Sequence, residues 1–287
     1  MLRPYLQLLR PQQWVKNGFV LVGVLFSHSW GQPELVTAAL LAFAAFSLAA
    51  SSIYVGNDYM DREQDRLHPR KCRRPLAAGT VRPAPALVLG LGCAAGALAL
   101  GAWVSPALLL IIAVYLALNL GYSLGWKHIP VLDVSIIAAG FMLRILAGTK
   151  GIGIVPSYWL LLCGLMVTLF LGFAKRRAEL NTLDEDAGSH RKVLTDYDTV
   201  LLDQLISICA AATIVSYSLY TVSAETVALH GTRYLVYTVP FVVYGIFRYL
   251  FLLHRRGGGG DPTTEILDSH LLVTAGLWLG AVLWLLS

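Results

Sequence analysis

Charged residues are scarce in this chain. Asp, Glu, Lys and Arg make up 14% of its 287 residues, whereas a soluble globular domain carries about 25%. Hydrophobic residues make up 56%, and the mean hydropathy is +0.64. The shortage of charge excludes an ordinary soluble domain and predicts an all-α polytopic membrane protein.

Cysteine is also scarce, and the common phosphate-binding motifs are missing. The four cysteines are scattered, so the sequence predicts neither a metal knuckle nor a disulfide framework. There is no Gly-x-x-x-x-Gly-Lys loop and no dinucleotide fingerprint, and the seven histidines show no metal-ligand spacing. Any phosphate group must therefore be held by a metal ion and by side chains. No cleavable signal peptide is expected, because Arg, Lys and Pro interrupt the start of the chain.

Nine apolar segments follow one another along the chain. Most contain about 20 residues, the length that an α-helix needs to cross a hydrocarbon core of about 30 Å, whereas the first is short. We therefore predict nine transmembrane helices. The loops between them are too small to fold separately, which predicts a single domain over residues 1–287. The segments are 17–31, 35–57, 84–102, 104–124, 131–149, 157–174, 202–222, 233–253 and 266–286.

Positive charge is distributed unevenly between the two sides of the predicted bundle. If the N-terminus is cytoplasmic, nearly all of the 22 Lys and Arg residues fall on the cytoplasmic side. Lys150 and Arg233 are the two in outer loops, and Arg144 lies within the fifth segment. The positive-inside rule then predicts a cytoplasmic N-terminus and an outer C-terminus. The net charge of +5 is accordingly attributed to basic loops near anionic headgroups, and no nucleic acid is expected as a partner.

A group of acidic side chains ends the second apolar segment. Residues 57–65 read Asn-Asp-Tyr-Met-Asp-Arg-Glu-Gln-Asp, so Asn57, Asp61 and Asp65 recur every four residues and share one helical face. Asp58 projects close to Asp65. Charged groups near membrane depth usually face a polar cavity, and oxygen ligands at this spacing suit Mg²⁺, which binds diphosphate oxygens. The alternative is a solvated helix end with ion pairs four residues apart.

Basic residues follow in the predicted cytoplasmic loops. Loop 58–83 continues with a string of Lys and Arg, and loop 175–201 begins Lys-Arg-Arg. Lys175, Arg176 and Glu179 would lie on one helical face, which suits contacts with phosphate or ribose hydroxyls. Basic and acidic groups from several loops can therefore converge on the cytoplasmic side.

The acidic motif, the helix count and the loop pattern resemble the UbiA-type intramembrane prenyltransferase superfamily over essentially the whole chain. Its first signature, Asn-Asp-x-x-Asp-x-x-x-Asp, is matched without a gap by Asn57, Asp58, Asp61 and Asp65. The resemblance implies a UbiA-type bundle with a cytoplasmic-side active site and a Mg²⁺ cofactor. It also implies catalytic and metal-binding roles for Asn57, Asp61 and Asp65.

The second signature of that superfamily is missing. Ordinary members carry another Asp-rich motif where this chain reads Lys-Arg-Arg-Ala-Glu at 175–179, and Asp184 and Asp186 are spaced two apart, not four. This departure resembles the polyprenyl-phosphate phosphoribosyltransferase branch, which includes enzymes that act on decaprenyl phosphate. Three further motifs support the same branch, at residues 10–17, 68–71 and 261–263.

The branch implies a particular reaction. It transfers the 5-phosphoribosyl group from 5-phosphoribosyl diphosphate to a polyprenyl phosphate, with release of pyrophosphate, for a cell-envelope glycolipid precursor. A site for three phosphate groups needs more cation and less carboxylate than a site for one allylic diphosphate. The implied partners are these two substrates and a bacterial inner membrane, with a homo-oligomer left open. The alternative is an ordinary UbiA-type prenyltransferase that moves an isoprenoid to an aromatic acceptor. A transporter is disfavoured, because the sequence offers no polar path across the bilayer.

The predicted substrate contacts come from the acidic motif and the polar loops. Two of them have ordinary structural explanations, since Lys16 could be an interfacial lysine and Tyr122 could belong to an aromatic belt. Arg144 needs a partner that the sequence does not name. The predicted substrate-binding residues are Lys16, Asp58, Lys71, Arg74, Tyr122, Lys127, Asp133, Lys175, Arg176 and Glu179.

Overall fold

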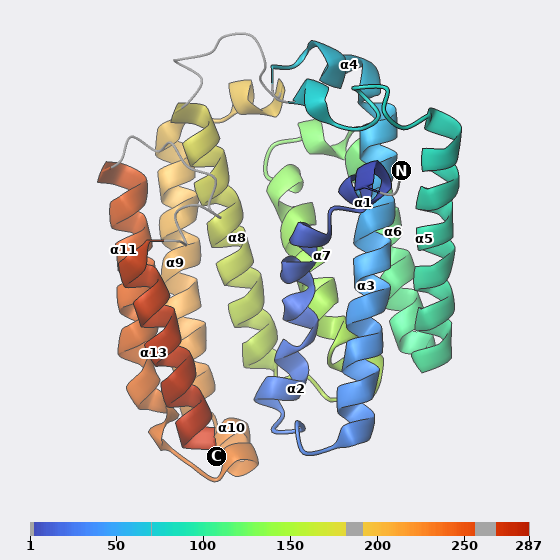
Figure 1. Ribbon diagram of the computed structural model, residues 1–287. Helices are drawn as coiled ribbons and strands as arrows, with labels where there is room; N and C mark the ends of the chain where they lie inside the picture. Colours follow the sequence, from blue (N-terminus) through green and yellow to red (C-terminus); the bar gives the residue numbers. More distant parts are fainter. Residues whose placement is uncertain (1–2, 70, 182–191, 256–267, 287) are drawn as a thin grey trace. The chain divides into compact units, whose positions relative to one another are not determined.

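The computed structural model describes residues 3–69, 71–181, 192–255 and 268–286, which form helices and connecting turns without a β-strand. The chain divides into two compact units. Unit 1 consists of Met1–Trp126 and Met142–Pro156, and unit 2 consists of Lys127–Phe141 and Ser157–Ser287. Figure 1 shows the helices of both units. The predicted all-α fold is confirmed.

Eight helical segments in the described ranges are long and apolar enough to cross a membrane. They correspond to eight of the nine predicted segments, so the chain is a multi-pass helical membrane protein. The helices are α3 (Pro33–Met60), α5 (Pro83–Val104), α6 (Pro106–Leu124), α7 (Leu132–Ala147), α8 (Tyr158–Asn181), α9 (Thr199–Val222), α11 (Val239–Arg255) and α13 (Ser269–Leu286). The span of α7 continues to Ile152 through the 3₁₀-helix η4 (Lys150–Ile152), and that of α11 begins at Tyr234 with the 3₁₀-helix η7 (Tyr234–Thr238).

The first predicted segment, 17–31, is not one continuous helix. Its residues belong to the 3₁₀-helix η1 (Pro11–Val20), the short helix α2 (Val22–Phe26) and a turn. Glycines within the segment lower its helix propensity. The side chain of Asn17 is fully buried and bonds to other segments of unit 1 instead of facing lipid. The segment therefore packs against the other helices of unit 1.

Unit 1 is built around α3, which packs against α5 and α6 (Figure 1). Each of these three helices begins with a proline, whose fixed φ suits the first turn. Ser105 caps α6 by accepting a hydrogen bond of 2.9 Å from the Leu108 amide. Alanines and Phe46 on α3 meet Leu108 and Ile112 of α6 in one buried cluster. The small side chains of α3 let neighbouring helices approach it closely.

The segment between α1 (Arg3–Leu9) and α2 is joined to α3 by side-chain hydrogen bonds. Asn17 Nδ2 donates to Ser47 Oγ at 3.0 Å, and Trp14 Nε1 donates to Ser51 Oγ at 3.1 Å. Ser51 Oγ in turn donates to the carbonyl oxygen of Leu9 at 2.8 Å. These bonds fix the part of the chain that carries Lys16.

The intramembrane arginine has polar and aromatic partners within unit 1. Arg144 Nε donates to Asn17 Oδ1 at 2.8 Å, and Nη2 donates to the Tyr115 hydroxyl at 3.1 Å. The guanidinium also lies over the rings of Tyr115 and Phe46, at 5.0 and 5.6 Å from their centroids. Hydrogen bonds and π faces thus stabilise a charge that would otherwise be costly at this depth. Arg144 therefore helps to fix η1.

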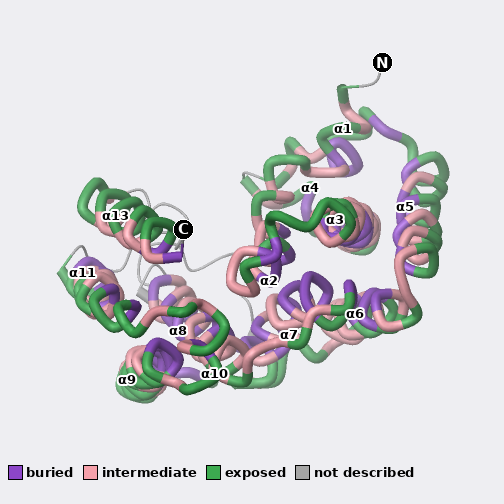
Figure 2. Tube along the Cα trace, turned by 90° about the horizontal axis from the view of Figure 1, so that it is seen from below, coloured by how far each residue is buried: buried purple, intermediate pink, exposed green. Residues whose placement is uncertain are grey.

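Unit 2 contains α8, α9, α11 and α13, with α8 packed along α9 and α11 in contact with both α9 and α13 (Figure 1). Asp198 caps α9 by accepting a hydrogen bond of 2.7 Å from the Leu201 amide. Phe170 and Phe173 of α8 share a buried cluster with Leu202 of α9. Figure 2 shows that α13 is mainly exposed or intermediate along its length, as expected of a helix that faces lipid.

Close packing within unit 1 gives a testable prediction. A Cβ atom added at Gly148 would overlap the backbone of Val20 in η1, and overpacking of this kind costs about 1–3 kcal/mol. We expect Gly148→Ala to lower the apparent melting temperature of the detergent-solubilised protein. Gly245→Ala is the control, because nothing lies within 4 Å of a Cβ at that position in α11, and it should not destabilise. Equal melting temperatures for the two variants would contradict the packing.

Candidate functional site

The acidic motif lies where α3 passes into α4 (Arg62–Leu67). Asn57 and Asp58 belong to the last turn of α3, Asp61 lies between the two helices, and Asp65 belongs to α4. The amides of Asp61 and Asp65 still bond to the carbonyl oxygens four residues earlier, at 2.9 and 2.8 Å. The predicted helical stacking is therefore nearly preserved across the break. Asp58 and Asp65 are buried, with 2% and 3% of their surface exposed.

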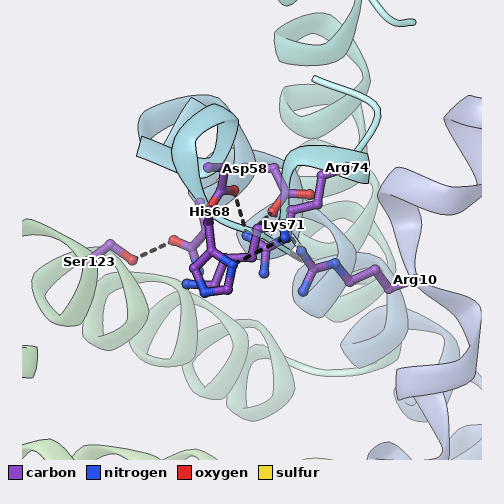
Figure 3. Close-up of polar contacts among 8 residues, drawn as sticks. Arg10, Asp58, His68, Lys71, Arg74 and Ser123 are labelled. Atoms are coloured by element: carbon purple, nitrogen blue, oxygen red, sulfur yellow. Dashed lines mark hydrogen bonds and ion pairs between the residues drawn. The ribbon is translucent and has the colours of Figure 1, made fainter. Parts of the chain in front are cut away.

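Two arginines converge on the buried carboxylates (Figure 3). Arg74 Nη1 lies 2.7 Å from Asp65 Oδ2 and 3.1 Å from Asp58 Oδ1. Arg10 Nη2 lies 2.6 Å from the same oxygen of Asp58. One guanidinium nitrogen thus bridges carboxylates from α3 and α4, and this nitrogen marks a point where both acidic groups face a cation.

The remaining members of the motif are Asn57, whose side-chain oxygen is hydrogen-bonded, and Asp61, whose carboxylate is not bonded within the described part of the chain. Asn57 Oδ1 accepts a hydrogen bond of 2.7 Å from Ser123 Oγ of α6, which fixes the amide (Figure 3). The Asp61 carboxylate is partly exposed, and no residue in the described ranges forms a hydrogen bond or ion pair with it. Asp61 is therefore the carboxylate of the motif that is available for an added ligand.

These oxygen donors fit a hard divalent cation that keeps part of its water shell. No group of three His, Cys, Asp or Glu side chains close enough to hold a metal ion occurs among the described residues. Mg²⁺ is commonly bound through one or two carboxylates plus water and substrate phosphates. Two carboxylates that face one cation, as Asp58 and Asp65 face Arg74, supply such a partial set of ligands.

Unit 1 also contains the predicted substrate-binding residues Lys16, Lys71 and Tyr122. Lys71 is exposed, and its backbone amide donates to His68 Nδ1 at 3.4 Å (Figure 3). Lys16 and Tyr122 are half-buried. Arg10 belongs to the motif at 10–17, and its contact with Asp58 spans 48 positions of sequence. Such a long-range ion pair has no signature in a single sequence.

Unit 2 brings three other predicted residues together. Arg176 Nε donates to Asp133 Oδ2 at 2.7 Å, and its Nη1 donates to Glu179 Oε2 at 2.5 Å. Arg176 and Asp133 are 1% and 0% exposed. Both side chains therefore belong to a buried network of ion pairs within unit 2. Their contacts with substrate stay predictions. Lys127 and Lys175 are half-buried.

Tyr197 completes this network, although no local pattern marks it in the sequence. Its hydroxyl donates to Asp133 Oδ1 at 2.8 Å and accepts from the Val131 amide at 2.6 Å, partners that are 64 and 66 positions away. Burial raises the pKa of the Tyr197 phenol to about 12. The hydroxyl therefore keeps its proton near neutral pH and can donate to the carboxylate.

Two of the predicted sequence features lie in the parts of the chain that the structure does not describe. The motif at 261–263 and the pair Asp184 and Asp186 lie outside the described residues. The structure consequently bears on the first acidic signature and on the basic run at 175–179.

The fold and these charged clusters define a polytopic helical membrane protein with paired acidic and basic groups at helix ends. Comparison with known proteins identifies its family. The model of the UbiA prenyltransferase family matches residues 18–265, and the chain belongs to this family.

Curated relatives match nearly the whole chain. The decaprenyl-phosphate phosphoribosyltransferase of Corynebacterium glutamicum is 36% identical over 279 residues, which cover 94% of this chain and 83% of the relative. The protein of the same name from Mycolicibacterium smegmatis is 34% identical over 285 residues, covering 96% and 89%.

A solved structure shares the fold. The structure of a UbiA homolog from Archaeoglobus fulgidus bound to GPP and Mg²⁺ has a TM-score of 0.72, covers 99% of each chain and is 17% identical. The UbiA-type helical bundle is therefore confirmed.

The bridging position of Arg74 gives a prediction about metal binding. Two unit charges 4 Å apart repel by about 4 kcal/mol at an effective dielectric constant of 20, and Arg74 is partly exposed, so solvent reduces this. Arg74→Gln should raise the affinity for Mn²⁺, a spectroscopic substitute for Mg²⁺, about tenfold without substrate. Electron paramagnetic resonance titration measures it. Arg66→Gln is the control, because Arg66 pairs with the exposed Glu63 instead. An unchanged affinity in Arg74→Gln would show that no cation site lies there.

Proposed function

We propose that this chain is a Mg²⁺-dependent polyprenyl-phosphate phosphoribosyltransferase. It transfers the 5-phosphoribosyl group from 5-phosphoribosyl diphosphate to a polyprenyl phosphate such as decaprenyl phosphate. The observation that carries the proposal is the identity of 33–36% with decaprenyl-phosphate phosphoribosyltransferases over 94–96% of the chain. The basic run at 175–179, where the resemblance implies an acidic motif in ordinary members, supports the same choice of donor.

The reaction exchanges one bond at the ribose. The bond between C1 and the diphosphate oxygen breaks, an oxygen of the lipid phosphate bonds to C1 from the opposite face, and pyrophosphate leaves. Bound Mg²⁺ would neutralise charge on the leaving diphosphate. Asp61 and Asp65, with the Asn57 amide oxygen, would hold the ion, and Asp58 would orient Arg74 towards the diphosphate. The lipid phosphate is already anionic near pH 7, so no strong general base is required.

Basic side chains would bind the remaining phosphate charge. Lys16, Lys71 and Arg74 of unit 1 are the proposed phosphate contacts there, and Lys127 and Lys175 are those of unit 2. Charge-assisted hydrogen bonds of this kind are worth about 1.5–3 kcal/mol each. Tyr122 would contact the substrates from α6. Arg176 would hold Asp133 and Glu179 in position, because its guanidinium is bound to both carboxylates. The predicted single catalytic domain over residues 1–287 stays a prediction.

An assay with defined substrates tests the proposal. Purified protein in Mg²⁺ should release pyrophosphate from 5-phosphoribosyl diphosphate only when a polyprenyl phosphate is present. It should not transfer a prenyl group from an allylic diphosphate to 4-hydroxybenzoate. Prenylation of the aromatic acid would favour the alternative, a UbiA-type aromatic prenyltransferase, and would overturn the proposed donor.

The carboxylate of Asp61 gives a prediction about catalysis. Asp61→Asn removes a proposed metal ligand and no buried contact, so kcat/KM should fall by about a hundredfold or more while expression and folding stay normal. Glu63→Gln is the matched control, since Glu63 is exposed two residues away and pairs only with Arg62 and Arg66 among the described residues. Similar activities for the two variants would remove Asp61 from the site.

We also propose a location in the bacterial inner membrane, with the N-terminus and the acidic motif on the cytoplasmic side. Cys72 lies in the loop after α4 and is partly exposed, so it should react with a membrane-impermeant maleimide in inverted vesicles. A cysteine introduced at Thr232, in a Cys72→Ser background, should react in right-side-out vesicles. Labelling of Cys72 from the outer face would reverse the proposed orientation.

A further inference from the structure

A strained residue lies in the turn before α7. Val131 has a φ of 66°, in the left-handed region that a β-branched residue rarely adopts. A backbone conformation of this kind persists only where the surroundings enforce it. Pro130 precedes Val131, and Lys127 lies four residues earlier in the short helix η3 (Trp126–His128). The strain is thus located between two residues proposed to serve the substrate, Lys127 and Asp133.

The hydroxyl of Tyr197 holds this turn. It accepts the Val131 N–H at 2.6 Å and donates its own proton to Asp133 Oδ1 at 2.8 Å. Tyr197 follows the 3₁₀-helix η6 (Lys192–Asp196) and is 5% exposed. A single buried hydroxyl therefore satisfies the amide of the strained residue and one oxygen of the carboxylate two residues later.

The other carboxylate oxygen connects the turn to α8. Asp133 Oδ2 accepts from Arg176 Nε at 2.7 Å, and Arg176 also donates to Glu179. The turn, the first residues of α7 and the end of α8 are joined in one buried network. Buried polar networks with every member paired are rigid, and they lose rigidity when one partner is removed.

We propose that Tyr197 is a positioning residue that clamps the strained turn at Val131 and so fixes Lys127 relative to Asp133 and Glu179 for binding an anionic substrate. The inference rests on the proposed function for its substrate class. The clamp itself lies entirely within unit 2 and is argued from the contacts there. Without the hydroxyl, Val131 relaxes to a negative φ and the turn carrying Lys127 moves.

Removal of the hydroxyl tests the clamp in two ways. In Tyr197→Phe, hydrogen exchange measured by mass spectrometry should be faster in a peptide covering 127–133. The KM for 5-phosphoribosyl diphosphate should rise about tenfold, with kcat changed less. Tyr220→Phe is the matched control, because Tyr220 is also a buried tyrosine, and its hydroxyl lies 3.2 Å from His230 Nε2. It should leave both quantities unchanged.

A second substitution separates positioning from general packing. Glycine adopts a positive φ without steric cost, so Val131→Gly in the Tyr197→Phe background should bring KM back to within about twofold of the wild type. If Tyr197→Phe does not fold, the double variant should fold. Exchange rates at 127–133 unchanged by Tyr197→Phe would overturn the clamp. So would a double variant no better than Tyr197→Phe.

The two levels of the proposal fail differently. If the wild-type protein does not transfer phosphoribosyl groups but exchange at 127–133 still depends on Tyr197, the clamp holds and the proposed function fails. If transfer is observed and KM in Tyr197→Phe equals that of the wild type, the function holds and the positioning role fails.

Discussion

Ionised side chains that are buried at the ends of apolar helices must be paired, and this constraint organises the polar part of the molecule. In unit 1, the buried carboxylates of Asp58 and Asp65 share one nitrogen of Arg74. Removing one partner of a fully buried pair costs about 3–5 kcal/mol, and the partial exposure of Arg74 and the second partner of Asp58, Arg10, make the cost smaller here. In the proposed function, a divalent cation on Asp61 and Asp65 would share the Asp65 carboxylate with Arg74. The ion pairs therefore stabilise the junction between α3 and α4.

Two buried arginines, Arg144 and Arg176, are also paired, each with a different set of partners. Arg144 lies within an apolar helix and is stabilised by the Asn17 amide, the Tyr115 hydroxyl and two aromatic rings. In unit 2, Arg176 is bound between Asp133 and Glu179. Each buried cation also fixes a segment that carries a proposed phosphate contact, η1 in the first case and the end of α8 in the second. Pairing thus contributes both to stability and to the placement of the site.

The sequence predicts those features that depend on local pattern. Apolar length predicts the eight long helices. The four-residue spacing of the acidic motif agrees with the backbone bonds from the Asp61 and Asp65 amides to the carbonyl oxygens four residues earlier. The segment 17–31 is largely helical but is not one continuous α-helix, since glycines lower its helix propensity and Asn17 bonds to Ser47 and Arg144. The contact between Arg10 and Asp58 and the role of Tyr197 could not be predicted, since each joins residues 48 or more positions apart.

The central claim is that the acidic motif binds the sugar donor through a divalent cation. Calorimetric titration of 5-phosphoribosyl diphosphate into the purified protein, without lipid acceptor, tests it directly. The account predicts measurable binding in Mg²⁺ and an affinity at least about tenfold weaker in chelator, since the donor would then meet the carboxylates of Asp61 and Asp65 unscreened. Equal affinity in Mg²⁺ and in chelator would contradict the claim.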